Sequence, residues 1–133
     1  MRNINTMKKI KILLVDDDPH MQRLISIFLK KRPYEIDKAG NGRVALRKIE
    51  TQTYDLIISD LQMPETDGIE LIGRIRRQKC TTPVILISAY GLDSIAEKAI
   101  EEGASSVLSK PFEAAELIQT IDKILQNSNN ENT

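Results

Sequence analysis

Short apolar runs alternate with amphipathic segments along most of the chain, and this alternation limits the possible fold more than any other feature. The first run, residues 10–15, is rich in β-branched side chains and stops at three consecutive aspartates. Further runs with strand character lie at 34–39, 56–58, 83–87 and 106–109. After each run, apolar residues recur at the three- and four-residue spacing of a helix. Five strands alternating with five helices predict a three-layer, doubly wound α/β domain with a parallel five-stranded sheet.

Local signals mark where the helical segments begin and end. Asp18 followed by Pro19 is typical of a helix start, since the carboxylate caps free N–H groups and proline suits the first helical position. Pro33 is expected to end this helix, and Gly103 to stop the fourth. The other helices are expected over 42–51, around Ile69, Ile72 and Ile75, over 92–102 and over 113–126. The chain thus divides into an N-terminal extension (1–7), one domain (8–126) and a polar tail (127–133) with nothing to bury.

Composition narrows the class of protein. A chain of 133 residues suits one domain and can bury a core without disulfides. Nineteen basic side chains balance nineteen acidic ones, which argues against nucleic acid as the main partner. The single cysteine fits a reducing compartment, and no apolar run approaches the roughly 18 residues of a membrane helix. We expect a soluble, cytoplasmic domain without a membrane partner.

Chemically active side chains follow four of the predicted strands. They are Asp16 and Asp17 after the first strand, Asp60 after the third, Ser88 after the fourth and Lys110 after the fifth. Ligands of open parallel sheets bind outside the carboxyl ends of the strands, so these side chains are expected to meet at one edge. Crowded carboxylates need a compensating cation, and oxygen ligands without histidine or cysteine favour a hard ion such as Mg²⁺.

Each member of this group also has a plainer explanation. Helix capping explains Asp18 but leaves Asp16 and Asp17 unexplained. Serine follows many strands, and a lone lysine is most often a solvated surface charge. The combination indicates chemistry, because an aspartate beside Mg²⁺ and a lysine can act as a nucleophile toward phosphorus.

At these positions the chain resembles the receiver domains of two-component response regulators, over roughly residues 8–126. The resemblance rests on five motifs in order, each at the end of an expected element. They are ILLVDDD (12–18), DLIISDLQMP (55–64), DG (67–68), PVILISA (83–89) and KPF (110–112). The resemblance implies a flavodoxin-like strand order, 2-1-3-4-5.

The resemblance also implies who exchanges the phosphoryl group and what binds the metal. Asp60 matches the phosphoacceptor, which takes a phosphoryl group from a phosphohistidine of a sensor histidine kinase or phosphotransfer protein. Asp17 and Asp60 match carboxylate ligands of Mg²⁺, for which Mn²⁺ can substitute. Asp16 would act through water, and the backbone carbonyl of Gln62 would complete the protein ligands.

Two further matches complete the implied site. Ser88 matches the hydroxyl that moves toward the phosphoryl group, and Ala89 the small residue that leaves it room. Lys110 matches the amine that pairs with Asp60 and then with the phosphoryl oxygens. The bond between Lys110 and Pro111 is expected to be cis.

Three residues predict how this chain would differ in output and lifetime. Val107 stands where the family usually has an aromatic ring that moves on activation. Because valine has few rotamers, we expect phosphorylation to rearrange mainly residues 89–102. Gln62 and Tyr90 flank the expected approach of a hydrolytic water, and their bulk predicts a long-lived phosphoryl group.

Other functional classes stay open beside this one. A Mg²⁺-dependent aspartyl-phosphate hydrolase would want an acid two residues after its nucleophile, where Gln62 cannot transfer a proton. A flavodoxin-like electron carrier would need a loop that cradles phosphate, which the aspartates at 16–18 would repel. A receiver cut from a longer regulator or hybrid kinase is a further alternative. We expect a stand-alone phosphoacceptor, not an enzyme, that signals to an unknown protein target.

Two polar stretches carry expectations about the surface. The first helix begins with His20, Gln22 and Arg23, and we expect it to be the docking surface for the phosphodonor protein. A basic run in the third helix is expected to be a solvated face at the helix end that favours cations. Its members are Arg74, Arg76, Arg77 and Lys79.

Overall fold

A parallel sheet covered by helices on both faces makes up the computed structural model, which describes residues 9–63, 67–89 and 93–131. The strand order is β2-β1-β3-β4-β5, so the predicted α/β class and order are confirmed. The strands are β1 (Ile10–Val15), β2 (Tyr34–Ala39), β3 (Leu56–Asp60), β4 (Val84–Ser88) and β5 (Ser106–Ser109). The helices are α1 (Pro19–Phe28), α2 (Gly42–Thr51), α3 (Gly68–Arg77), α4 (Asp93–Glu102) and α5 (Ala114–Glu131).

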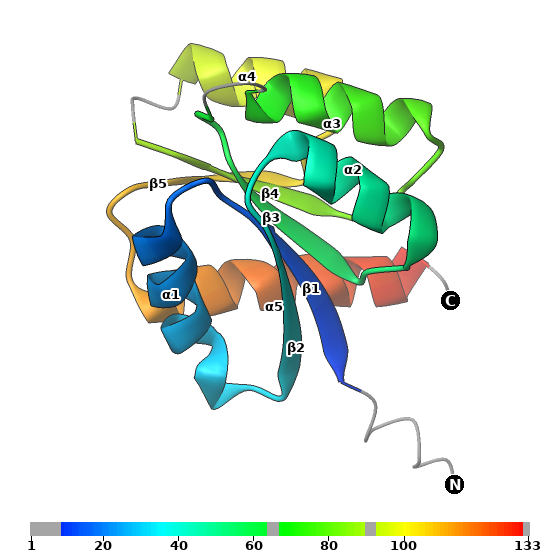
Figure 1. The fold of residues 1–133 in the computed structure, drawn as a ribbon. Coiled ribbons are helices and arrows are strands. Elements are labelled where there is room, and N and C mark those ends of the chain that lie inside the picture. Colours follow the sequence, from blue (N-terminus) through cyan, green and yellow to red (C-terminus); the bar gives the residue numbers. More distant parts are fainter. Residues whose placement is uncertain (1–8, 64–66, 90–92, 132–133) are drawn as a thin grey trace, which may run out of the picture.

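The helices form two layers, and the strands send alternate side chains to each. α1 and α5 cover one face of the sheet, while α2, α3 and α4 cover the other (Figure 1). In β1, Leu13 and Val15 join the core on the α2–α3–α4 side, whereas Ile12 and Leu14 pack with Ile25 of α1. Every residue of β3 and β4 is buried, as the continuous apolar runs of these strands predict.

Side-chain caps begin the helices that follow β1, β2 and β3. Asp18 accepts a hydrogen bond from the backbone N–H of His20 at 2.9 Å, with Pro19 in the first helical position, as predicted. Asn41 and Asp67 accept in the same way from N–H groups three residues further on, at 2.9 and 2.8 Å. These caps fix where each helix leaves the edge of the sheet at which the strands end.

Two helix ends differ from expectation. α1 is α-helical only to Phe28, and a 3₁₀ turn, Leu29–Lys31, carries the chain toward Pro33. α5 runs on to Glu131 instead of ending near residue 126. Neither glycine nor proline follows Gln126, so nothing in that sequence breaks the helix. Most of the predicted polar tail is therefore helical.

One member of the basic run is held inside the fold. Arg76 is half-buried, and its Nη1 donates to the carbonyl oxygens of Cys80 and Thr82 at 2.9 and 2.8 Å. Its Nη2 donates to the carbonyl oxygen of Gly103 at 2.7 Å. The solvated face predicted for this run is wrong at Arg76, because its guanidinium joins the end of α3 to the turn after α4.

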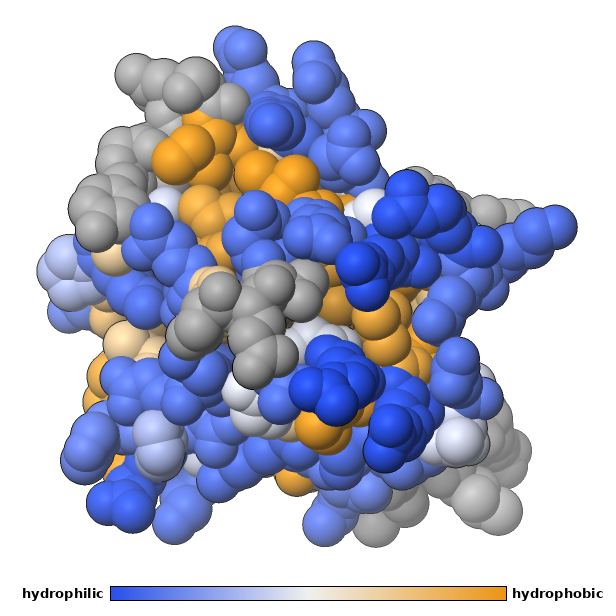
Figure 2. All heavy atoms as spheres, turned by 45° about the horizontal axis from the view of Figure 1, so that its top comes forward, coloured by the Kyte–Doolittle hydropathy of each residue, from blue (hydrophilic) through white to orange (hydrophobic). Residues whose placement is uncertain are grey.

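Hydrophilic side chains cover most of the face seen in Figure 2, with apolar groups between them. Among the described residues, the large hydrophobic side chains that are well exposed are Leu24 and Ile27 on α1 and Ile100 on α4. Within the same part of the chain, no helix is both long and apolar enough to cross a bilayer.

Candidate functional site

Three carboxylates meet where β1 and β3 end. Asp16 and Asp17 directly follow β1, and Asp60 is the last residue of β3. One carboxylate oxygen from each lies within 4.8 Å of the others. Asp16 and Asp60 are only 2% and 9% exposed, whereas Asp17 is open to solvent. These three residues thus lie together at the carboxyl ends of the strands, as predicted from their positions after the apolar runs.

Burial makes negative charge on the acidic group unfavourable. Removal from water, together with the nearby charge of Asp60, raises the pKa of Asp16 to about 6. The backbone N–H of Asp18 donates to Asp16 Oδ1 at 2.9 Å and opposes the rise. A divalent cation among the three carboxylates would relieve this repulsion, and oxygen-only donors suit Mg²⁺. The residues present therefore fit the ion that the sequence predicts.

Lys110 brings the positive charge of the site. Its Nζ lies 3.4 Å from Asp60 Oδ1, and its backbone N–H donates to the carbonyl oxygen of Ser88 at 2.7 Å. The peptide bond between Lys110 and Pro111 is cis, as expected. An amine beside a carboxylate can stabilise charge that moves onto a group bound there.

Ser88 is fully buried at the end of β4, next to the end of β3. In the register of these strands Asp60 is paired with Ile87, the residue before Ser88. The N–H of Leu61 donates to the carbonyl oxygen of Ile87 at 2.8 Å and continues the ladder past Asp60. The structure therefore brings the predicted hydroxyl to the same edge as the carboxylates and the amine.

Three further predicted residues follow Asp60 and Ser88 in the sequence. Gln62 is exposed two residues after Asp60, and the ligand role of its carbonyl stays a prediction. Ala89 is exposed beside Ser88. Tyr90, on which the predicted lifetime partly depends, lies outside the described residues.

One contact of the site was missed by the sequence reasoning. Gln22, expected on the docking surface, is half-buried, and its Nε2 donates to the carbonyl oxygen of Asp16 at 2.7 Å. A polar residue in the first turns of an amphipathic helix carries no signal that distinguishes this role from solvent exposure.

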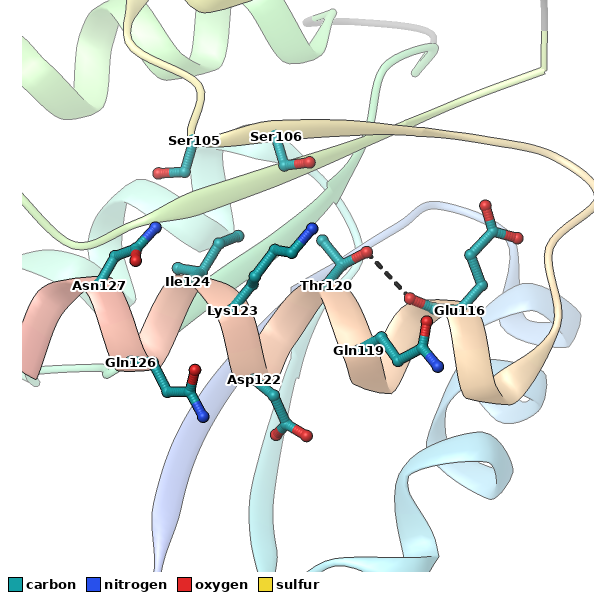
Figure 3. Close-up of a pocket in the computed structure, with 10 residues that line it drawn as sticks. All are labelled: Ser105, Ser106, Glu116, Gln119, Thr120, Asp122, Lys123, Ile124, Gln126 and Asn127. Atoms are coloured by element: carbon teal, nitrogen blue, oxygen red, sulfur yellow. Dashed lines mark hydrogen bonds between the residues drawn. The ribbon is translucent and has the colours of Figure 1, made fainter.

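A cavity lies elsewhere, between β5 and α5. It has a volume of about 510 Å³ and is lined by ten residues, none of them a predicted site residue (Figure 3). Ser105 and Ser106 face a row of polar side chains along α5, in which Thr120 Oγ1 donates to the carbonyl oxygen of Glu116 at 2.9 Å (Figure 3). The cavity holds neither the acidic group nor Lys110, so it is separate from the site.

Comparison with known proteins identifies the family that has this arrangement. The family model described as "Response regulator receiver domain" matches residues 12–122. The chain belongs to the response regulator receiver domain family. It is 39% identical over 116 residues to the transcriptional regulatory protein ResD of Bacillus subtilis, and the match covers 87% of this chain and 48% of ResD.

Solved receiver structures share the fold. The receiver domain of the Francisella response regulator 1452 gives a TM-score of 0.84 at 32% identity, covering 90% of this chain and 99% of that one. Vibrio cholerae chemotaxis protein CheY4 gives 0.82 at 30% identity, covering 87% of this chain and 98% of CheY4. This receiver chain therefore spans nearly all of these two structures but about half the length of ResD.

Proposed function

We propose that this receiver domain accepts a phosphoryl group on Asp60 and signals through phosphorylation-dependent contacts with another protein. One observation carries the proposal: the Asp60 carboxylate lies with two other carboxylates within 4.8 Å and with the Lys110 amine at 3.4 Å. Such a group can hold a divalent cation and a phosphoryl group at the same time, because the amine and the cation offset the negative charges.

The proposed reaction moves a phosphoryl group from nitrogen to oxygen. A carboxylate oxygen of Asp60 forms the new O–P bond while the P–N bond of a phosphohistidine breaks, and the bonding pair returns to the imidazole nitrogen. The Lys110 ammonium turns from Asp60 to the phosphoryl oxygens, and the Ser88 hydroxyl donates to one of them. Mg²⁺ held by Asp17, Asp60 and the backbone carbonyl of Gln62, with Asp16 acting through water, would neutralise charge on these oxygens.

A phosphoacceptor is favoured over a phosphatase. A hydrolase of aspartyl phosphates needs a general acid near its nucleophile, and the side chain two residues after Asp60 is the amide of Gln62. We therefore propose that the chain is not an enzyme.

Because the chain spans about half the length of ResD, output from within a longer regulator is the alternative to a stand-alone role. A cytoplasmic location stays a prediction.

Docking of the phosphodonor protein is proposed on α1, which borders the acidic group. The segment 19–33 contains four lysines and arginines and no acidic residue. His20 and Arg23 are exposed on α1 together with the apolar side chains of Leu24 and Ile27. An exposed apolar contact beside basic side chains suits a partner surface that carries acidic side chains.

Transfer from acetyl phosphate tests the assignment. With Mg²⁺ the wild-type protein should gain one acid-stable, base-labile phosphoryl group, detected as about 80 Da by intact mass spectrometry. Asp60→Asn should abolish it, and Asp17→Asn should slow transfer by weakening Mg²⁺ binding. Asp55→Asn, an exposed change at the other end of the β3 segment, is the matched control and should react like the wild type. Phosphorylation of Asp60→Asn at the wild-type rate would overturn the proposal.

A further inference from the structure

The backbone of the acidic loop is held by a side chain from α1. Where β1 stops, the N–H of Asp16 still donates to the carbonyl oxygen of Ala39 at 3.0 Å. The carbonyl oxygen of Asp16 instead accepts from Nε2 of Gln22 at 2.7 Å. The same Nε2 lies 3.4 Å from the carbonyl oxygen of Ala39, so one amide spans the ends of β1 and β2.

This carbonyl belongs to the peptide unit that joins Asp16 to Asp17. The peptide unit is planar, so fixing its oxygen fixes the plane between the two Cα atoms from which both carboxylates project. The backbone N–H of Gln22 also donates to the carbonyl oxygen of Asp18 at 3.0 Å, which seats the Gln22 side chain over the loop. Gln22 therefore restrains the backbone between the two residues that carry these carboxylates, through their shared peptide unit.

We propose that Gln22 is a positioning residue of the cation site. Groups that orient metal ligands through hydrogen bonds commonly contribute tenfold or more to metal affinity. Gln22 acts here through the backbone, by keeping the oxygens of Asp16 and Asp17 turned toward Asp60. The inference rests on the proposed function, because it assumes that the acidic group holds a divalent cation.

Direct metal binding is the first test. The electron paramagnetic resonance signal of free Mn²⁺ gives the Kd of the unphosphorylated protein, and Gln22→Met removes the amide at nearly constant length. We expect a Kd about tenfold above that of the wild type. Ser26→Ala is the matched control, since Ser26 lies one turn along α1 and its Oγ donates to the carbonyl oxygen of Gln22 at 2.8 Å. Its Kd should stay within twofold of the wild-type value.

Phosphorylation separates positioning from general damage to the fold. In Gln22→Met the Mg²⁺ concentration for half-maximal transfer from acetyl phosphate should rise about tenfold, while the rate at saturating Mg²⁺ should approach that of the wild type. A loss of folding stability alone would leave the Mg²⁺ requirement of the folded molecules unchanged. Gln22→Asn, whose amide is one methylene too short to reach Asp16, is the second variant should Gln22→Met fail to fold.

The outcomes distinguish the inference from the proposed function. Equal Mn²⁺ affinity in the wild type and in a folded Gln22 variant overturns the inference alone. A lower rate at saturating Mg²⁺ with an unchanged half-maximal Mg²⁺ concentration also overturns the inference alone. A wild-type protein that binds no Mn²⁺ and gains no phosphoryl group on Asp60 overturns the proposed function, and the inference with it.

Discussion

At the scale of single residues, Asp16 combines a charge with nearly complete burial. Its pKa is raised to about 6 from an ordinary value of 3.8, chiefly by removal from water. Between these two pH values the folded state binds more protons than the unfolded state, so the contribution of Asp16 to stability falls as the pH rises. Above pH 6 the cost of burying the charge is present in full.

This sign gives a prediction for the metal-free protein. Asp16→Asn keeps an oxygen to accept from the N–H of Asp18 but removes the charge, so it should raise the free energy of unfolding by about 2 kcal/mol at pH 7.5. The gain should fall by more than half at pH 4.5. Urea unfolding with EDTA at both pH values measures it, and added Mg²⁺ should shrink the gain at pH 7.5. A gain that is larger at pH 4.5 would show the sign to be wrong.

Gly68, the first residue of α3, lies so close to the backbone at the end of β3 that no larger residue fits there. A Cβ there would lie 2.8 Å from the carbonyl oxygen of Asp60 and 2.9 Å from the Cα of Leu61. Both are backbone atoms beside the acidic group, so they cannot move aside without moving the site. Gly68→Ala should therefore lower the free energy of unfolding by about 2–3 kcal/mol in urea and slow phosphorylation. Gly40→Ala is the control, because nothing lies within 4 Å of its added Cβ.

At the scale of elements, Arg76 is the link that joins α3 to the end of α4. Arg76→Met removes three hydrogen bonds to carbonyl oxygens but keeps the alkyl stem. We expect a loss of about 2–4 kcal/mol in the free energy of unfolding, because the carbonyls of Cys80, Thr82 and Gly103 lose a charged donor. Arg77→Met, a change at the exposed neighbour, should cost less than about 0.5 kcal/mol. Equal losses of unfolding free energy in the two variants would show that Arg76 does not join α3 to the end of α4.

At the scale of the whole molecule, we predict that Val107 determines which layer of the fold changes on phosphorylation. It is half-buried in β5, paired in register with Leu86, and packs against the core on the α2–α3–α4 side. A short branched side chain in this place has no ring to swing. Amide exchange with and without beryllofluoride should therefore change mainly over residues 89–102, and not at all in Asp60→Asn. A change confined to β5 and α5 would contradict the prediction.

Much of the fold and most of the site could be predicted because they depend on local pattern. Continuous apolar runs mark strands buried on both faces, and parallel strands place their carboxyl ends at one edge. These two rules suffice to bring Asp16, Asp17 and Asp60 together, with Ser88 and Lys110 beside them. The cap at Asp18 and the stop at Gly103, whose φ is 117°, follow equally from local chemistry.

The remaining features depend on contacts between segments far apart or on side-chain reach. Arg76 has the sequence pattern of a solvated charge, and only the fold brings Gly103 to it, 27 residues further on. Gln22 has the pattern of a polar position on a helix, and only the turn after β1 brings its amide to the backbone of Asp16. The sequence by itself determined the elements, their order along the chain and the charges at the sheet edge, because these follow from periodicity and strand direction. Only the tertiary structure decided which side chains donate to the backbone carbonyls around the site and between the helices, since a hydrogen bond between distant segments depends on the position of both ends.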